Sequence, residues 1–205
     1  MADFSLEDQC SGIVCGLDEV GRGPLAGPVV AACVVIPKEK RDLDFIVDIK
    51  DSKKVSLKKR EELYNKITKH FPYAISEISP AEIDEMNILQ ASLEAMKRAH
   101  DQIEIITHSL VDGNKLPELS SSAMAVVKGD QKSKTIAAAS IIAKVHRDRI
   151  MTSLSQEYPY YGWERNSGYP TKEHRDALLT FGVTPHHRKS FRPVSDLLNM
   201  QKIAS

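Results

Sequence analysis

The segment from residue 16 to residue 28 constrains the fold more than any other part of the sequence. It reads Gly-Leu-Asp-Glu-Val-Gly-Arg-Gly-Pro-Leu-Ala-Gly-Pro and follows the apolar residues Ile13 to Cys15. Its two prolines disfavour a helix, because proline has no N–H and clashes with the preceding turn. The pattern predicts a strand that ends at Asp18 and Glu19, followed by a tight turn. Carboxylates at a strand end suit a hard divalent cation, and Arg22 in the turn suits a phosphate.

The glycines of this turn have two explanations. Their order, with Gly27 as the third, departs from the dinucleotide-binding fingerprint, in which the third glycine falls one place earlier at the start of a helix. Because they lack a Cβ, Gly21 and Gly23 allow a ligand to approach the backbone closely. On spacing alone, a phosphate-facing loop beside a metal site and a tight turn with two solvated acids are about equally supported.

The remainder of the chain alternates between expected strands and helices. Strands are expected at Ile13–Leu17, Val29–Ile36, Tyr73–Ile78, Thr107–Val111 and Ala123–Val127. Helices are expected over 56–69, after the capping box at 79–82, through 89–103, and over 133–154, 171–182 and 193–200. This order indicates an α/β fold. No repeat or linker interrupts the chain, so we expect one domain over residues 1–205, with a helical C-terminal part from about residue 165.

Three of the expected strands end in acidic residues, namely Asp18 with Glu19, Asp112, and Asp130. Neighbouring strand ends meet at one edge of an α/β sheet, where such proteins place their sites. Carboxylates without nearby His or Cys favour Mg²⁺ or Mn²⁺ over zinc. Taken singly, Asp112 is better explained as a turn residue and Asp130 as an acid at a helix N-terminus. Adjacent strand residues point to opposite faces, so Asp18 and Glu19 share a site only if the strand is distorted, or if one acts through a second metal or its carbonyl.

The charge is unevenly distributed although the formal net charge is zero. The chain has 28 Lys and Arg and 28 Asp and Glu, and the basic residues gather at 50–60, 128–134, 144–149 and 186–192. Each run alone is best explained as a solvated face. Together the runs could line one groove and neutralise backbone phosphates, with Lys53, Lys54 and Arg188 as candidate contacts.

The sequence gives no indication of a membrane protein. Its longest apolar run, Val29–Ile36, is too short to span a bilayer, and the first residues lack an apolar signal core. We therefore expect a cytoplasmic protein without membrane association. The three cysteines, Cys10, Cys15 and Cys33, have no metal-binding spacing.

Taken in order, these motifs resemble those of bacterial ribonuclease HII, the type 2 ribonuclease H family. Besides 16–28, the resemblance covers 51–54, 87–90, 111–114, 128–130, 136–145, 147–148, 168–174 and 187–191, which is nearly the whole chain. It implies a ribonuclease H-like fold, with a central mixed sheet flanked by helices and additional C-terminal helices. The sister ribonuclease HIII family has a large N-terminal substrate-binding extension and a different residue between the two glycines. This sequence has neither feature, which favours HII.

The resemblance also implies a function and a set of site residues. It implies an endonuclease, acting as a monomer, that hydrolyses the RNA strand of RNA/DNA hybrids and cleaves on the 5′ side of single ribonucleotides in duplex DNA. Two divalent ions, Mn²⁺ or Mg²⁺, would catalyse the reaction and leave 3′-hydroxyl and 5′-phosphate ends. The implied metal ligands and catalytic residues are Asp18, Glu19, Asp112 and Asp130, and the implied substrate-binding residues are Gly21, Arg22, Gly23 and Tyr169.

Two other functions stay open from the sequence. One is a nuclease or resolvase of the same broad fold that acts on DNA without requiring a ribose. The other is a nucleic-acid-binding module with a vestigial acid cluster, although the complete set of four acids argues against it. Without the resemblance, Tyr169 would be explained as a half-buried packing aromatic.

Overall fold

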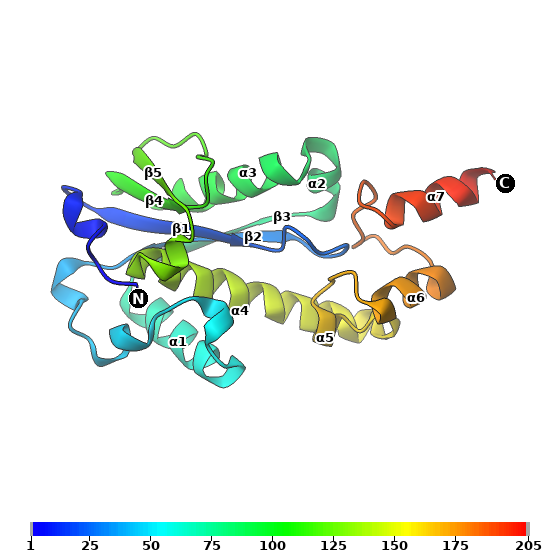
Figure 1. Ribbon diagram of the computed structural model, residues 1–205, viewed down its shortest axis with the longest axis horizontal. Coiled ribbons are helices and arrows are strands. Elements are labelled where there is room, and N and C mark those ends of the chain that lie inside the picture. The colour runs from blue at the N-terminus through cyan, green and yellow to red at the C-terminus, as the bar shows by residue number, and fades with distance from the viewer. Residues whose placement is uncertain (1, 204–205) are drawn as a thin grey trace.

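The protein is built on a five-stranded mixed sheet. A computed structural model describes residues 2–203. The strands are β1 (Val14–Val20), β2 (Val29–Val35), β3 (Tyr73–Ile78), β4 (His108–Asp112) and β5 (Ser122–Val126), and they lie in the order β3-β2-β1-β4-β5 (Figure 1). Strand β2 pairs antiparallel with both β1 and β3, whereas β4 pairs parallel with β1 and β5 parallel with β4. The expected mixed sheet is confirmed.

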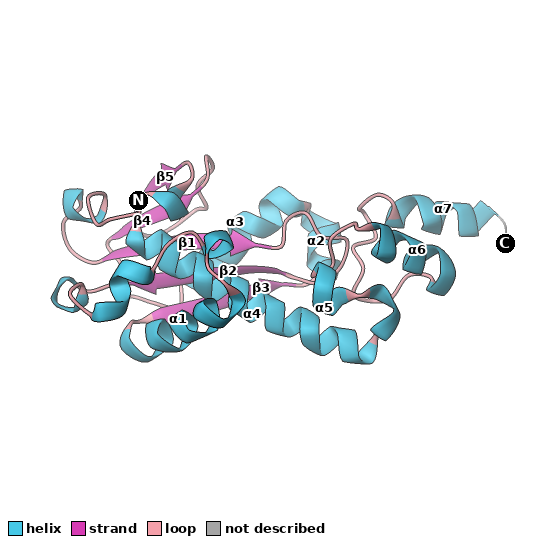
Figure 2. Ribbon diagram, turned by 60° about the horizontal axis from the view of Figure 1, so that its bottom comes forward, coloured by secondary structure: helices cyan, strands magenta, loops and turns pink. Residues whose placement is uncertain are grey.

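Helices cover both faces of this sheet. They are α1 (Leu57–His70), α2 (Pro80–Met86), α3 (Ile88–His100), α4 (Lys134–Glu157), α5 (Trp163–Asn166), α6 (Lys172–Phe181) and α7 (Val194–Ile203). Figure 1 shows α2 and α3 on one face and α1 and α4 on the other. Figure 2 shows α5, α6 and α7 gathered beyond one end of the sheet, where α4 extends past the strands. The expected C-terminal helices are therefore present.

Strand β2 shows why the sheet needs helices on both sides. All seven of its residues are buried. Val30, Ala32 and Val34 belong to the apolar cluster under α1 and α4, whereas the alternate residues, such as Val29 and Ala31, belong to the cluster under α3. A continuously apolar strand fits this position, because successive side chains point to opposite faces.

Several helix starts follow local sequence signals. Ser56 Oγ accepts the N–H of Lys59 at α1, and Ser79 forms a complete capping box with Glu82 at α2. Ser133 Oγ and Thr171 Oγ1 cap α4 and α6. These caps satisfy N–H groups that have no partner inside the helix. They explain why the expected helices begin within a residue or two of the observed ones.

The N-terminal half of α4 packs directly against β1. A Cβ on Gly16 would lie 2.2 Å from the backbone carbon of Thr135, so only glycine permits this approach. Several residues in this part of α4 are small, among them Ala137, Ala138 and Ala139, all fully buried. Close packing places the next turns of α4 beneath the point where β1 and β4 separate.

Candidate active site

The site forms where the pairing of β1 with β4 stops. The parallel register runs from Val14 opposite His108 to Leu17 opposite Val111, so Asp18 and Asp112 are the next residues of the two strands. Like charges on neighbouring strands repel each other. The antiparallel pairing of β1 with β2 continues to Val20. The acids Asp18 and Glu19 therefore lie inside β1, not at its end as the sequence predicted.

Asp18 and Glu19 share a site without a distortion of the strand. Because β1 stays paired with β2, its alternation is preserved: Val20 packs on the cluster under α4, and Leu17 belongs to the cluster under α3. Asp18 accordingly lies on the α4 side and Glu19 on the α3 side. Both line one pocket, since β4 no longer covers the edge of β1 there.

This pocket, of about 430 Å³, brings together most of the candidate site residues. Its lining includes Asp18, Glu19, Gly21, Arg22, Gly23, Lys53, Asp112, Asp130 and Tyr169. The side chain of Lys54, the remaining candidate, lies outside the described part of the chain. Segments from six separate parts of the sequence thus meet at one edge of the sheet.

Hydrogen bonds from the backbone orient two of the carboxylates. Asp18 Oδ1 accepts the N–H of Glu19 at 2.8 Å, and Asp112 Oδ1 accepts the N–H of Gly129 at 2.6 Å. The second bond ties the end of β4 to the short 3₁₀ turn Gly129–Gln131, which carries Asp130. The turn therefore brings the fourth acid to the other three.

The electrostatics of the cluster are unfavourable without a cation. Burial, together with the charges of Glu19 and Asp112, raises the pKa of Asp18 well above its usual value. Burial also raises the pKa of Glu19, against the opposing effect of Arg22, whose Nη1 lies 3.4 Å from Glu19 Oε1. Burial and the neighbouring Asp51 raise the pKa of Asp130 to about 6. Arg22 alone does not offset this concentration of negative charge.

The donor set fits a hard divalent ion. Within residues 2–203, no three His, Cys, Asp or Glu side chains stand close enough together to form a ready-made metal site. Four carboxylates nevertheless line one pocket, and carboxylate oxygens are the ligands that Mg²⁺ and Mn²⁺ prefer. A bound cation would have to draw these side chains together, and it would relieve their mutual repulsion.

The two glycines beside Arg22 serve different purposes. Gly21 has φ +96°, and a Cβ there would lie 2.3 Å from Arg147 Nε, so the space beside it is filled by the protein itself. A Cβ on Gly23 would lie 3.4 Å from the ring of Tyr169. Tyr169 is 43% exposed, which is too open for a packing residue of the core. Gly23 thus gives the Tyr169 ring room beside the loop.

Three polar residues of the pocket were not among the candidates from the sequence. They are Ser52, Ser140 and Lys144. Ser140 and Lys144 are one helical turn apart on α4, and Lys144 Nζ lies 2.6 Å from Asp148 Oδ1. Ser140 Oγ accepts the N–H of Ser52 at 3.3 Å. Their helical spacing was visible in the sequence, but only the packing of α4 on β1 brings them to the acids.

Among the side chains that the structure describes, the basic runs do not line one continuous phosphate-binding groove, and the expectation for Arg188 is wrong. Arg188, Arg147 and His187 are buried, with 1% exposure or less, and Lys134 is 6% exposed. Lys134 Nζ donates to the carbonyl oxygens of Ile46 and Ile49. Long basic side chains enter the interior here because backbone carbonyls satisfy their N–H groups. Of the three candidate contacts, Lys53 lies exposed at the pocket as expected, and Lys144 of the run 144–149 also lines the pocket.

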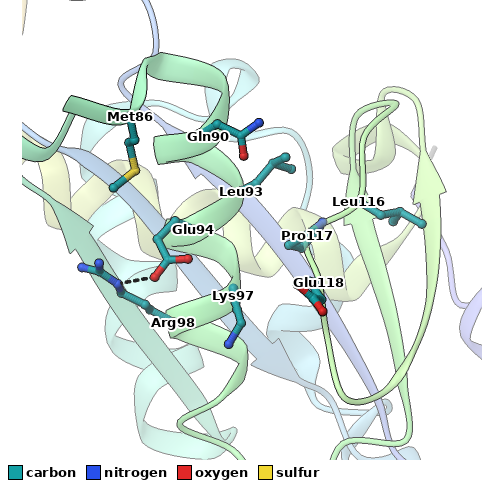
Figure 3. Close-up of a pocket in the computed structure, with 9 residues that line it drawn as sticks. All are labelled: Met86, Gln90, Leu93, Glu94, Lys97, Arg98, Leu116, Pro117 and Glu118. Carbon is teal, nitrogen blue, oxygen red and sulfur yellow. Dashed lines mark hydrogen bonds and ion pairs between the residues drawn. The ribbon is translucent and has the colours of Figure 1, made fainter. Parts of the chain in front are cut away.

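A second depression lies between α3 and the loop around Pro117 (Figure 3). It encloses about 440 Å³. Its basic side chains are paired with acids of α3 or the residue after it: Arg98 with Glu94 at 2.7 Å, and Lys97 with Asp101 at 2.6 Å. This arrangement leaves no excess positive charge for a phosphate, so the acid-lined pocket is the stronger candidate site.

None of the described helices is long and apolar enough to cross a membrane.

A mixed sheet of this order, with carboxylates gathered where β1 and β4 separate, is typical of nucleases with the ribonuclease H-like fold. Comparison with known proteins identifies the group within this class. The family model described as Ribonuclease HII matches residues 15–194, and the chain belongs to that family. The protein is therefore a hydrolase, an endonuclease acting on the RNA strand of RNA/DNA hybrids.

Individual relatives agree with this assignment. A ribonuclease HII of Magnetococcus marinus is 54% identical over 190 residues, covering 90% of this chain and 87% of the relative. That of Rhodospirillum rubrum is 52% identical over 201 residues, covering 97% and 92%. The crystal structure of the Pyrococcus horikoshii ribonuclease H2 has a TM-score of 0.76 at 29% identity, covering 93% of this chain and 99% of that one. A ribonuclease HIII solved in complex with Mn²⁺ shares the fold at 17% identity, with a TM-score of 0.67.

Proposed function

We propose that this protein cleaves on the 5′ side of a single ribonucleotide embedded in duplex DNA, as well as within continuous RNA/DNA hybrids. The products would carry a 3′-hydroxyl and a 5′-phosphate. The observation that carries the proposal is the lining of one pocket by four carboxylates, the Gly21–Gly23 loop and the half-exposed ring of Tyr169.

The four acids would hold two divalent ions, Mg²⁺ or Mn²⁺. When bound, such ions activate a water molecule and stabilise the leaving 3′ oxygen. Asp18, Glu19, Asp112 and Asp130 contribute the oxygen ligands, and a bound cation would relieve the burial and repulsion that raise the pKa of Asp18, Glu19 and Asp130. The N–H groups of Glu19 and Gly129 hold two of the carboxylates in place beforehand.

The Gly21–Gly23 loop and Tyr169 would distinguish ribose from deoxyribose. The 2′-hydroxyl is the feature that separates RNA from DNA, and backbone groups of the loop can hydrogen-bond to it. Arg22, beside Glu19 at the rim, would contact a neighbouring phosphate. The Tyr169 ring would pack on the next sugar, where an additional hydroxyl would crowd it. The recognised object is then a junction from ribose to deoxyribose.

Lys53 would contact the phosphate backbone beside the acids, and Lys54 follows it in the sequence. A positive charge here offsets the repulsion between the phosphate and the carboxylates. Lys144 shares the pocket, but its ammonium is already paired with Asp148.

Three duplexes of one sequence test the proposal: all DNA, DNA with one ribonucleotide, and a continuous RNA/DNA hybrid. With Mg²⁺ or Mn²⁺, we expect cleavage of the last two and none of the first, and no cleavage with a chelator. Mapping the ends should place the cut 5′ of the single ribonucleotide. Cleavage of the hybrid alone would refute junction recognition, and cleavage of all-DNA duplexes or junctions would favour a DNA nuclease or resolvase.

A further inference from the structure

Two buried arginines hold the glycine loop from beneath. Arg188 and Arg147 are both fully buried. Arg188 donates to the carbonyl oxygens of Gly21 at 2.5 Å, Arg22 at 3.0 Å and Gly27 at 2.9 Å. Each of these carbonyls belongs to the loop that follows β1.

Arg147 holds the same loop from α4 and ties it to the segment before Tyr169. Its Nη2 donates to Ala26 at 3.1 Å and its Nε to Pro28 at 2.9 Å. Its Nη1 donates to the carbonyl oxygen of Ser167 at 3.0 Å. One guanidinium group therefore connects the loop and the turn that carries Tyr169.

Burying two guanidinium groups costs free energy of folding, so stability alone is a poor explanation for this arrangement. Among the described residues, no carboxylate forms an ion pair with either guanidinium, and all their hydrogen-bond acceptors are neutral carbonyls. Burial lowers the pKa of Arg147 to about 10 and that of Arg188 to about 9. Apolar side chains of similar volume often stabilise a protein as well as buried charges do. The role of the two arginines is therefore better inferred from the geometry that they impose on the loop than from their effect on stability.

That geometry determines where the N–H groups of the loop point. In a trans peptide, the carbonyl oxygen of one residue and the N–H of the next point in opposite directions. Since the carbonyls of Gly21 and Arg22 point inward to Arg188, the N–H groups of Arg22 and Gly23 point away from it. Neither N–H donates a hydrogen bond to another residue in the range 2–203, and both residues line the pocket.

We propose that Arg188, supported by Arg147, is a positioning residue that aims the N–H groups of Arg22 and Gly23 at the ribose and phosphate of the substrate. The inference rests on the proposed function and deepens it. It attributes the discrimination between ribose and deoxyribose to the orientation of two peptide units, those that join Gly21 to Arg22 and Arg22 to Gly23. Lysine cannot replace this arginine. Its ammonium is a compact point charge and cannot hold three carbonyls in the planar fork of a guanidinium.

The test measures binding without catalysis. A duplex with one ribonucleotide and the matched all-DNA duplex are titrated by fluorescence anisotropy in a chelator, and the ratio of the two affinities is recorded. Arg188→Lys should reduce this ratio about tenfold, the loss of roughly one directed hydrogen bond. Affinity for the all-DNA duplex should change much less. Free guanidinium at millimolar concentration should restore the ratio in Arg188→Ala, whereas an equal concentration of sodium should not.

Arg149→Lys is the matched control. Arg149 lies on α4 two residues after Arg147, is exposed, and pairs with Glu61 instead of the loop. Its substitution should leave the ratio unchanged. An unchanged ratio in a folded Arg188→Lys, with discrimination by the wild type, would overturn the inference alone. A wild type that does not discriminate would overturn the proposed function.

A measurement on the wild type does not depend on any variant folding. The backbone amide resonances of Arg22 and Gly23 should shift on titration with the ribonucleotide duplex and much less with the all-DNA duplex. Equal shifts for the two duplexes would contradict the assignment of these N–H groups to ribose recognition.

Discussion

At the scale of single residues, Asp18 shows that the site is arranged for ion binding at the expense of stability. Its carboxylate is buried beside other acids, and its pKa is raised well above the unfolded value. A raised carboxylate pKa means that the native state binds the proton more tightly than the unfolded chain. Stability is therefore lost as the pH rises from the unfolded to the folded pKa, and the cost is present at neutral pH.

Asp18→Asn should consequently have opposite effects on activity and stability. We expect turnover with Mg²⁺ to fall on the order of 100-fold or more, because a lost metal ligand costs several kcal/mol in the transition state. The melting temperature in a chelator should rise, since repulsion is removed. Glu19→Gln, Asp112→Asn and Asp130→Asn should also reduce turnover severely.

Cleavage assays and thermal denaturation check this prediction. Asp176→Asn is the control, because Asp176 pairs with Lys172 on the surface of α6 and should affect neither quantity. Near-normal cleavage by Asp18→Asn with Mg²⁺ would refute the metal-site assignment.

Tyr169 permits a second prediction at the residue scale. Tyr169→Ala should lose much of the preference for a ribose–deoxyribose junction over a continuous hybrid, because the ring beside Gly23 is removed. Tyr169→Phe keeps the ring and should lose less. The ratio of kcat/KM for the two substrates is the measurement. Equal losses in both variants would show that the hydroxyl, not the ring, determines the preference.

At the scale of elements, a pair of histidines joins α6 to the segment that carries Arg188. His187 Nε2 lies 3.0 Å from His174 Nε2, which also accepts the Trp163 indole N–H at 3.2 Å. His187 Nδ1 accepts the N–H of Thr184 at 3.0 Å. His187 must therefore carry its proton on Nε2 and donate it to His174. His174 in turn donates from Nδ1 to the carbonyl of Tyr169. This chain of bonds requires both rings to be neutral.

The pair should make the C-terminal helices sensitive to acid. Burial, with smaller contributions from His174 and His186, lowers the pKa of His187 from 6.5 to about 3. Between these two pKa values the unfolded chain binds a proton at His187 that the native state does not. The stability that depends on neutral His187 is therefore present above pH 6.5 and is lost as the pH falls, by about 2 kcal/mol at pH 5.

Urea unfolding at pH 7 and pH 5 measures this loss. The wild type should lose more stability than His187→Gln, which cannot bind the proton. An equal loss in both proteins would show that other groups determine the acid sensitivity.

At the scale of the whole molecule, the net charge is zero, but basic side chains line the pocket beside the acids and can contact phosphates. Binding of duplex should weaken as salt increases, because phosphate contacts release counterions. Lys53→Gln should reduce the slope of log affinity against log salt concentration by the amount that corresponds to about one phosphate contact. Lys172→Gln, which changes an exposed lysine outside the pocket, should leave the slope unchanged. A flat response of the wild type would exclude phosphate contacts as the source of affinity.

The expected monomer stays a prediction that sedimentation can test.

The sequence by itself determined the elements and the chemical groups. Caps at Ser56, Ser79, Ser133 and Thr171 and the periodicity of apolar residues predicted nearly every helix and strand, because these signals act within a few residues. The acids of the site were also recognisable, since their type and order suit one kind of ion. The family resemblance added Tyr169, which local pattern alone would have placed in the packing.

Only the tertiary structure decided how these groups are used. It showed that Asp18 and Glu19 share a pocket across a regular strand, because β4 stops covering β1 at that point. It also placed Arg188 in the interior, bonded to Gly21, a residue 167 positions away in the chain. Burial of a charge depends on acceptors supplied by distant segments, and a run of basic residues carries no local record of them.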